Sequence, residues 1–129
     1  MMRPNSYRDL YVWRKAMLLA REGYALSRRL PPNEVHALSA QLRRAVVSVP
    51  ANIAEGNGRS SLRSYLLHLH IARGSLHEVE TLVLVAIAAG LVSPSHAEPV
   101  LALASETSRL LTRLVKALRA KMDGRGAKG

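Results

Sequence analysis

The sequence predicts an all-α protein, an antiparallel up-down-up-down four-helix bundle in one domain. Apolar residues recur at spacings of three and four along four stretches, and the alternation typical of strands is absent from the sequence. Aromatic residues make up 4% of the 129 residues and Phe is absent, so the core must consist of Leu, Val, Ile and Ala. A chain of this length buries about 70% of its unfolded surface. The short connections between the four stretches favour antiparallel neighbours.

The first helix is predicted over residues 7–29. Ser6, with Asp9 three residues later, forms a capping box that is typical of a helix start. The Leu-Pro-Pro sequence at 30–32 ends the helix. Two adjacent apolar stripes predict contact with more than one neighbour. They consist of Leu10, Trp13, Met17, Ala20 and Tyr24, and of Val12, Ala16, Leu19 and Leu26.

The second helix is predicted over residues 33–57, with Asn33 as its cap. Pro50 removes one backbone donor and presses on the carbonyl of the preceding turn, which costs about 3 kcal/mol in a helix interior. We therefore expect a kink at Pro50, with Ser48 or Asn52 available to satisfy the freed carbonyl. Two helices that break at Pro50 are the alternative. The core face is Val35, Leu38, Leu42, Val46, Val49 and Ile53.

The third helix is predicted over residues 61–89, between Ser60 or Ser61 and the stop signal Gly90. Its last turns, LVLVAIAAG, are apolar on all sides and are expected to be deeply buried. Gly74 costs about 1 kcal/mol relative to Ala in mid-helix, and the close approach of a neighbouring helix would explain it. The core face is Leu62, Leu66, Leu69, Leu76, Val79 and Val83.

The fourth helix is predicted over residues 95–121. Ser95 and Glu98 form a second capping box, although Pro99 complicates the start. The seam consists of Leu101, Ala104, Leu111, Leu114 and Leu118. The bundle domain thus spans residues 1–121, and residues 122–129 are expected to form a flexible basic tail.

A polar stripe runs along the second helix opposite its apolar face. Spacings of three and four place on one side Gln41, Arg44, Ser48, Asn52, Glu55 and Arg59. Alanines flank the stripe and let another backbone come close. We interpret its first five members as a polar seam between helices or subunits, and an ordinary solvent-exposed face is the alternative.

The formal net charge of +10, from 19 basic and 9 acidic residues, favours polyanionic partners. Candidate phosphate contacts are Arg43, Arg44, Arg59, Arg63, Arg109, Arg113, Lys116 and Arg119. A merely solvated surface is the alternative, as are cations that complement the dipole of a helix C-terminus. Because aromatic residues are few, contacts to the backbone of RNA or DNA are favoured over stacking on single-stranded bases.

Several classes of site are not indicated by the sequence. Cysteine is absent, which excludes disulfides and thiolate metal sites and fits a reducing cytosol. Neither a signal peptide nor a bilayer-spanning apolar run is found in the sequence. His70, His77 and Glu80 share one side of the third helix, yet Arg73 between them would repel a cation, so interhelical polar contact is the preferred interpretation. Phosphate-loop and hydrolase motifs are missing, so we expect no catalytic residues, metal or cofactor.

Three stretches together resemble the four-helix-bundle family of ribosomal-RNA intervening-sequence proteins: LYVWRKAMLLA, LSAQLRRAVVSVPANIAEGNGRSS and YLLHLHIARGSLHEVETLVLVA, within residues 7–91. The resemblance implies a small cytosolic homopentamer around a central axis. It also implies a relation to the accessory proteins of diversity-generating retroelements, which form basic barrels that bind nucleic acid and a reverse transcriptase. No catalytic residues carry over from the family.

Two functional hypotheses follow from these observations. The first is a non-enzymatic, self-assembling, cytoplasmic module that binds RNA or DNA through its basic patches and has a nucleic-acid enzyme as a further partner. The second is a structural or protein-interaction scaffold without a nucleic-acid role. Neither hypothesis involves a membrane.

Overall fold

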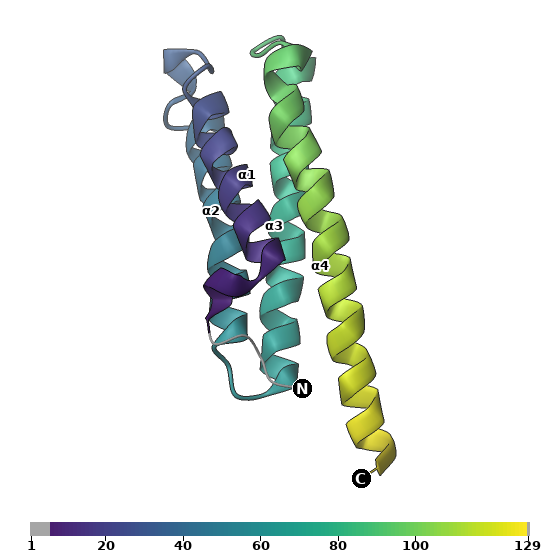
Figure 1. The fold of residues 1–129 in the computed structure, drawn as a ribbon. Helices are drawn as coiled ribbons and strands as arrows, with labels where there is room; N and C mark the ends of the chain where they lie inside the picture. Colours follow the sequence, from purple (N-terminus) through teal and green to yellow (C-terminus); the bar gives the residue numbers. More distant parts are fainter. Residues whose placement is uncertain (1–5, 129) are drawn as a thin grey trace.

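The computed structural model describes residues 6–128, with side chains as far as Gly124. Within this range the chain forms four helices: α1 (Tyr11–Ser27), α2 (Leu38–Asn57), α3 (Leu62–Ala88) and α4 (Pro94–Lys128). Each helix packs on the next and α4 packs on α1, whereas the backbones of the diagonal pairs stay further apart in the described part of the chain. Successive helices run antiparallel, as Figure 1 shows. The predicted four-helix bundle is therefore confirmed.

The predicted start of the first helix is wrong by one turn. Ser6 does cap a turn, because its hydroxyl accepts a hydrogen bond from the Arg8 amide at 3.1 Å, but this turn is the short 3-10 helix Tyr7–Asp9. Leu10 then adopts an extended conformation, with φ −73° and ψ 125°, so α1 begins only at Tyr11. The helix ends at Ser27 rather than at residue 29.

The second helix also begins later than predicted, at Leu38 rather than at residue 33. Asn33 cannot act as its cap because it lies inside a second 3-10 turn, Pro32–Glu34. Val35, predicted to be in the core, follows this turn and is 44% exposed. The guanidinium of Arg43 donates to the Val35 carbonyl at 3.3 Å and so ties this connection to the side of α2.

Helix α2 runs without interruption through Pro50, so the alternative of two separate helices is wrong. Asn52, which was expected to satisfy the carbonyl freed by Pro50, does make a local hydrogen bond, but to another carbonyl. The amide of Asn52 donates to the Ser48 carbonyl at 2.9 Å, rather than to the carbonyl that Pro50 frees. A bend of the axis at Pro50 stays a prediction.

The ends of α3 follow the sequence signals closely. The Ser61 hydroxyl accepts from the Ser64 amide at 3.1 Å. Gly90 has the left-handed φ of 73° that favours glycine, and the amide of Leu91 reaches back to the Ala86 carbonyl at 2.9 Å. This pairing is the Schellman arrangement that ends many helices.

The start of α4 differs from its predicted cap. The amide of His96 donates to the hydroxyl of Ser93 at 3.1 Å, so Ser93 rather than Ser95 caps the helix. Pro94 fits the first helical position because its missing N–H would have no partner there. The helix continues to Lys128, through most of the segment predicted as a tail, and Gly129 lies outside the described residues.

The core lies along the bundle axis, and the predicted core face of α3 is buried throughout, with Leu69 and Leu76 fully inaccessible. The expectation that the end of α3 is deeply buried is wrong on its outer side, where Leu84 is 55% exposed among the residues that the structure describes. The close approach expected at Gly74 is also not found within the chain, since an added Cβ would meet nothing within 4 Å. The helices instead come close at Gly23 and Gly56.

Candidate nucleic-acid interface

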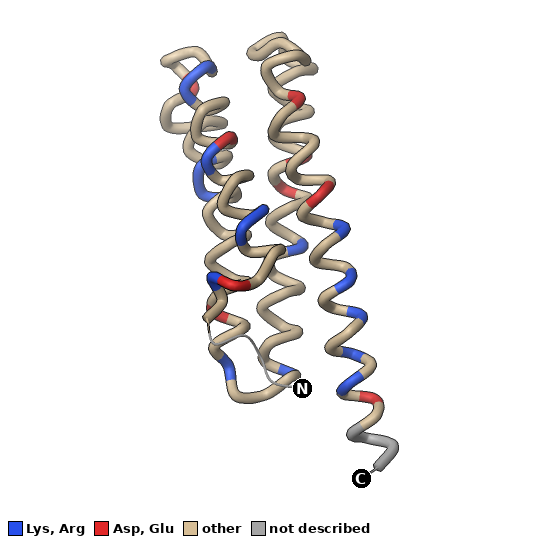
Figure 2. Tube along the Cα trace, in the orientation of Figure 1, with Lys and Arg blue, Asp and Glu red and all other residues tan. Residues whose placement is uncertain are grey.

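The outer face of α4 carries three cations in succession. Arg109, Arg113 and Lys116 are exposed, and their spacing of four and three places them on one side of the helix. Arg109 donates to the hydroxyl of Ser105 at 2.8 Å, which holds its guanidinium along the helix. The basic residues of α4 follow one another along the half of the helix that leads to its C-terminus (Figure 2). We call Arg109, Arg113 and Lys116 the cationic face.

The two edges of α4 are tied to its neighbours by polar contacts. Towards α1, the Lys15 ammonium lies 3.1 Å from a carboxylate oxygen of Glu106. This hydrogen bond raises the pKa of Lys15 above its ordinary value of 10.5, which favours the charged form of the lysine. Towards α3, Arg119 donates to Nε2 of His70 at 3.1 Å. The acid nearest to the cationic face is thus engaged by Lys15, and the face itself keeps its positive charge.

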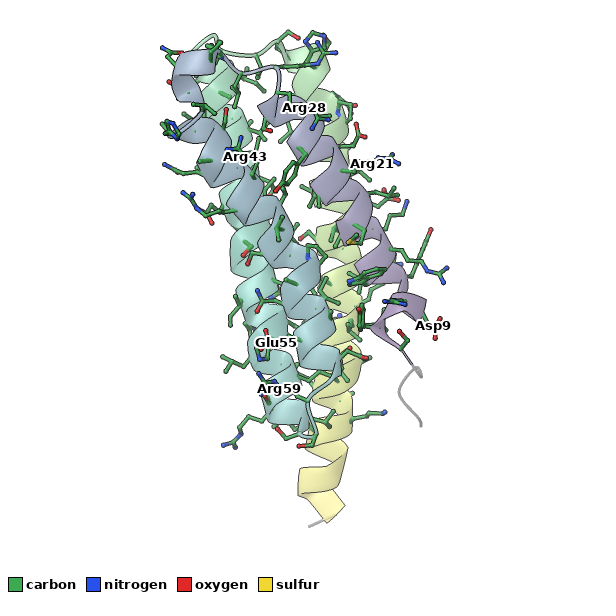
Figure 3. All side chains as sticks on the ribbon, turned by 90° about the vertical axis from the view of Figure 1, so that its left-hand side faces the viewer. Asp9, Arg21, Arg28, Arg43, Glu55 and Arg59 are labelled. Carbon is green, nitrogen blue, oxygen red and sulfur yellow. The ribbon has the colours of Figure 1, made fainter. Side chains whose placement is uncertain are left out.

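The remaining predicted cations fall into two groups. Arg59 and Arg63 lie beside the α2–α3 turn, at the end of the bundle that the C-terminal half of α4 also reaches (Figure 2). Arg43 and Arg44 lie in the first turns of α2, towards the other end. Arg59 is paired with Glu55 at 2.8 Å, and Figure 3 shows both side chains on the outside of the bundle. The candidates on α4 therefore extend from the middle of the bundle towards the end that holds Arg59 and Arg63, whereas Arg43 and Arg44 lie apart from them.

The polar stripe of α2 contributes two side chains to a seam with α3. Ser75 donates to the Ser48 hydroxyl at 2.8 Å, and the Asn52 amide donates to the same hydroxyl at 3.1 Å. The Asn52 carbonyl oxygen lies 3.2 Å from Nδ1 of His68. The other predicted members of this interface are exposed, namely Gln41, Arg44 and Glu55. A role for these three between subunits stays a prediction.

Sequence reasoning did not identify the α3 half of this seam. His68 and Ser75 are seven residues apart and therefore share one side of α3, next to the apolar face. This spacing of seven residues could have revealed the pair. Two polar residues two turns apart beside a row of leucines indicate that the neighbouring helix also carries polar residues there, as α2 does.

Substitution of Ser48 by alanine is expected to lower the free energy of unfolding by about 0.5–1.5 kcal/mol. The change removes the hydroxyl that accepts from both Ser75 and Asn52 and leaves these donors less well satisfied. Chemical denaturation of the Ser48→Ala variant measures the loss. Ser60→Ala, at an exposed position of the α2–α3 turn, is the matched control and should change little. Equal effects at the two positions would contradict the seam.

Two other kinds of site are absent from the described residues. No three side chains of His, Asp or Glu come together there in a way that could hold a metal ion. Within the same residues, none of the helices combines the length and the apolar character that crossing a bilayer requires.

Comparisons with known proteins give one family and related structures. The model of the family described as 23S rRNA-intervening sequence protein matches residues 8–113, which include the first half of α4. Among the solved structures that match is a protein of unknown function from the S23 ribosomal protein family of Bacteroides thetaiotaomicron. It is 25% identical and superposes with a TM-score of 0.75 over 81% of this chain and 98% of its own. No curated protein matches.

Proposed function

Because the chain belongs to the family of 23S rRNA-intervening sequence proteins, we propose that it is a non-enzymatic, self-assembling bundle that binds nucleic acid through the cationic face. The observation that carries this proposal is the arrangement on α4. Arg109, Arg113 and Lys116 point outward from one side of the helix, and no acidic residue occurs between Thr107 and Met122.

Phosphate backbones are the polyanions that such a face fits. Each phosphate that Lys or Arg neutralises releases condensed counterions, so affinity falls steeply as the salt concentration rises. The guanidinium groups of Arg109 and Arg113 can each hold a phosphate through two parallel hydrogen bonds. The three residues of the face carry no aromatic ring, but the exposed ring of Tyr11 lines the same hollow as Arg109 and Arg113. The cations themselves offer contacts to backbone phosphates rather than to bases.

Self-assembly would strengthen these contacts, because several weak sites on one particle bind a long polymer with avidity. We propose a homopentamer in the cytoplasm, as the family resemblance implies, with one cationic face on each copy. A nucleic-acid enzyme as a further partner belongs to the same proposal.

Reversing the charge at Arg113 and Lys116 together is expected to weaken binding to an RNA duplex and to reduce the salt dependence by about two counterions for each engaged copy. Fluorescence anisotropy against salt concentration measures both effects. The matched control is Arg28→Glu with Arg29→Glu, which makes the same change in net charge just beyond the end of α1.

Comparison of the α4 variant with its control distinguishes binding at the cationic face from a general effect of net charge. Loss of binding in the α4 variant alone supports the cationic face. Equal losses in both variants would mean that only net charge matters. Unchanged binding of the α4 variant would remove the face from the proposal.

A protein-interaction scaffold is the second candidate, and the exposed apolar residues favour it. Leu84 and Val85 are 55% and 49% exposed near the end of α3. Apolar surface of this kind marks protein contacts more often than nucleic-acid contacts. Absence of RNA and DNA binding by the wild-type protein at low salt would select the scaffold.

A further inference from the structure

One outer stripe of α3 is unusually apolar for an exposed helix surface. Leu67 is 59% exposed and Ile71 is 45% exposed. Gly74 follows on the same side with open space around it, and the exposed Glu78 continues the stripe. We call these four residues the α3 ridge. Because Gly74 lacks a side chain, another surface can come close to the backbone at the middle of the ridge.

The outer surface between α1 and α2 is hollowed rather than raised. A hollow of about 390 Å³ lies between Tyr24 and Arg44, and a second of about 280 Å³ lies beside Met17 and Pro50. Val47 lines both hollows and is 44% exposed, so the two lie next to each other along α2. Figure 3 views this side of the bundle, with α1 and α2 next to each other. We call this surface the α1–α2 groove.

We infer that the α3 ridge of one copy docks into the α1–α2 groove of a second copy of this chain. Both surfaces expose apolar side chains, and the hollows beside Val47 offer space for Leu67 and Ile71 of the ridge. Their charges also match, since the ridge carries Glu78 and the rim of the groove carries Arg43 and Arg44. The inference rests on the self-assembly proposed above and specifies the faces that would carry it.

The heights of the two surfaces along the bundle agree. The hydrogen bond between Ser48 and Ser75 shows that these two residues lie at the same position along the bundle axis. Because the helices are antiparallel, Arg44 on α2 and Glu78 on α3 both lie about one turn, or 5.4 Å, beyond that position in the same direction. Ile71 lies about one turn on the other side of that position, level with the second hollow.

This agreement has a geometric consequence for the assembly. Copies related by rotation about an axis parallel to the helices meet at equal heights, so Glu78 of one copy reaches Arg44 of the next. The two surfaces lie on different sides of the chain, which makes the contact heterologous rather than isologous. A heterologous contact of this kind closes into a ring when the rotation allows it.

Two single substitutions test the inference by blocking one surface each. Ile71→Asp places a charge on the ridge, and Val47→Asp places one in the groove. Both side chains are about half exposed, at 45% and 44%, so the fold should persist and circular dichroism checks it. Light scattering is expected to find the wild type as one oligomer and each variant as a monomer. Leu84→Asp, at an apolar position of α3 that is 55% exposed and lies outside the ridge, should assemble like the wild type.

Mixing the two blocked variants gives the decisive result. The Val47→Asp copy keeps a working ridge and the Ile71→Asp copy keeps a working groove, so an equimolar mixture should form a dimer that grows no further. A mixture that stays monomeric, or variants that assemble like the wild type, would overturn the assignment of faces. A monomeric wild-type protein would overturn the proposed self-assembly as well. Nucleic-acid binding is measured by the anisotropy experiment described above and does not depend on this result.

A charge exchange probes the rim of the same contact. Glu78→Arg and Arg44→Glu are each expected to weaken assembly about three- to tenfold, judged by the concentration at which the oligomer dissociates. The double variant restores the opposite charges and should recover most of the loss. A double variant that dissociates at least as readily as the worse single variant would show that the two residues do not meet.

Discussion

Replacing Tyr65 with alanine is expected to lower the free energy of unfolding by about 3–5 kcal/mol, the range for removing a large buried aromatic side chain. Tyr65 is 2% exposed and has the greatest volume among the fully buried side chains described. It packs where α2 ends and α3 begins, against the backbone of Gly56. Neighbouring helices cannot fill the space of a whole ring, so the variant keeps a cavity. Urea denaturation measures the loss.

The conservative variant separates packing from hydrogen bonding at the same position. The Tyr65 hydroxyl accepts from the Asn57 amide at 3.2 Å. Tyr65→Phe keeps the ring and removes only this group, so its cost should be about 0.5–1.5 kcal/mol. A loss in the phenylalanine variant as large as that in the alanine variant would contradict the importance of the ring.

Gly23→Val is expected to destabilise the bundle by about 1–3 kcal/mol through overpacking. A Cβ added at Gly23 would lie 2.5 Å from Cγ1 of Val46, across the α1–α2 crossing. Val46 is fully buried and β-branched, so it has little freedom to turn away. The two helices must separate to admit the new side chain. Thermal or chemical unfolding monitored by circular dichroism measures the effect.

Two further variants show whether the crossing is responsible. Gly124→Val changes a glycine of α4 that has nothing within 4 Å, so its stability should stay close to that of the wild type. Adding Val46→Ala to Gly23→Val makes room at the crossing, and the double variant should be more stable than the sum of the single losses predicts. Strict additivity would show that Gly23 and Val46 act independently.

The number of helices, their order and most of the core were predictable from the sequence because apolar spacing reports burial directly. Leu42, Val46 and Leu69 all occupy the interior as their spacing predicts. Helix starts were harder to predict, because Ser6 and Asn33 occur in the pattern of a cap yet belong to 3-10 turns. A side chain that can accept one backbone hydrogen bond signals a turn, and the sequence does not show which kind of helix follows.

The sequence also did not reveal which apolar residues of the helices are exposed to solvent. An apolar residue in a helix is expected to face a neighbour, and Leu84 and Val85 satisfy that pattern without having one in the chain. The cationic face was predictable because Arg109, Arg113 and Lys116 are close in sequence and their spacing alone fixes their side of α4. The α1–α2 groove was not, because its residues come from two helices whose relative placement depends on the whole bundle.

The contact between α1 and α4 also has a consequence for folding kinetics. The other three seams join helices that are consecutive in the chain, whereas this one joins the first helix to the last. Local seams form early because the loops that they close are short, and the cost in chain entropy grows with the length that must be closed. The α1–α4 seam is therefore expected to form last as the bundle folds.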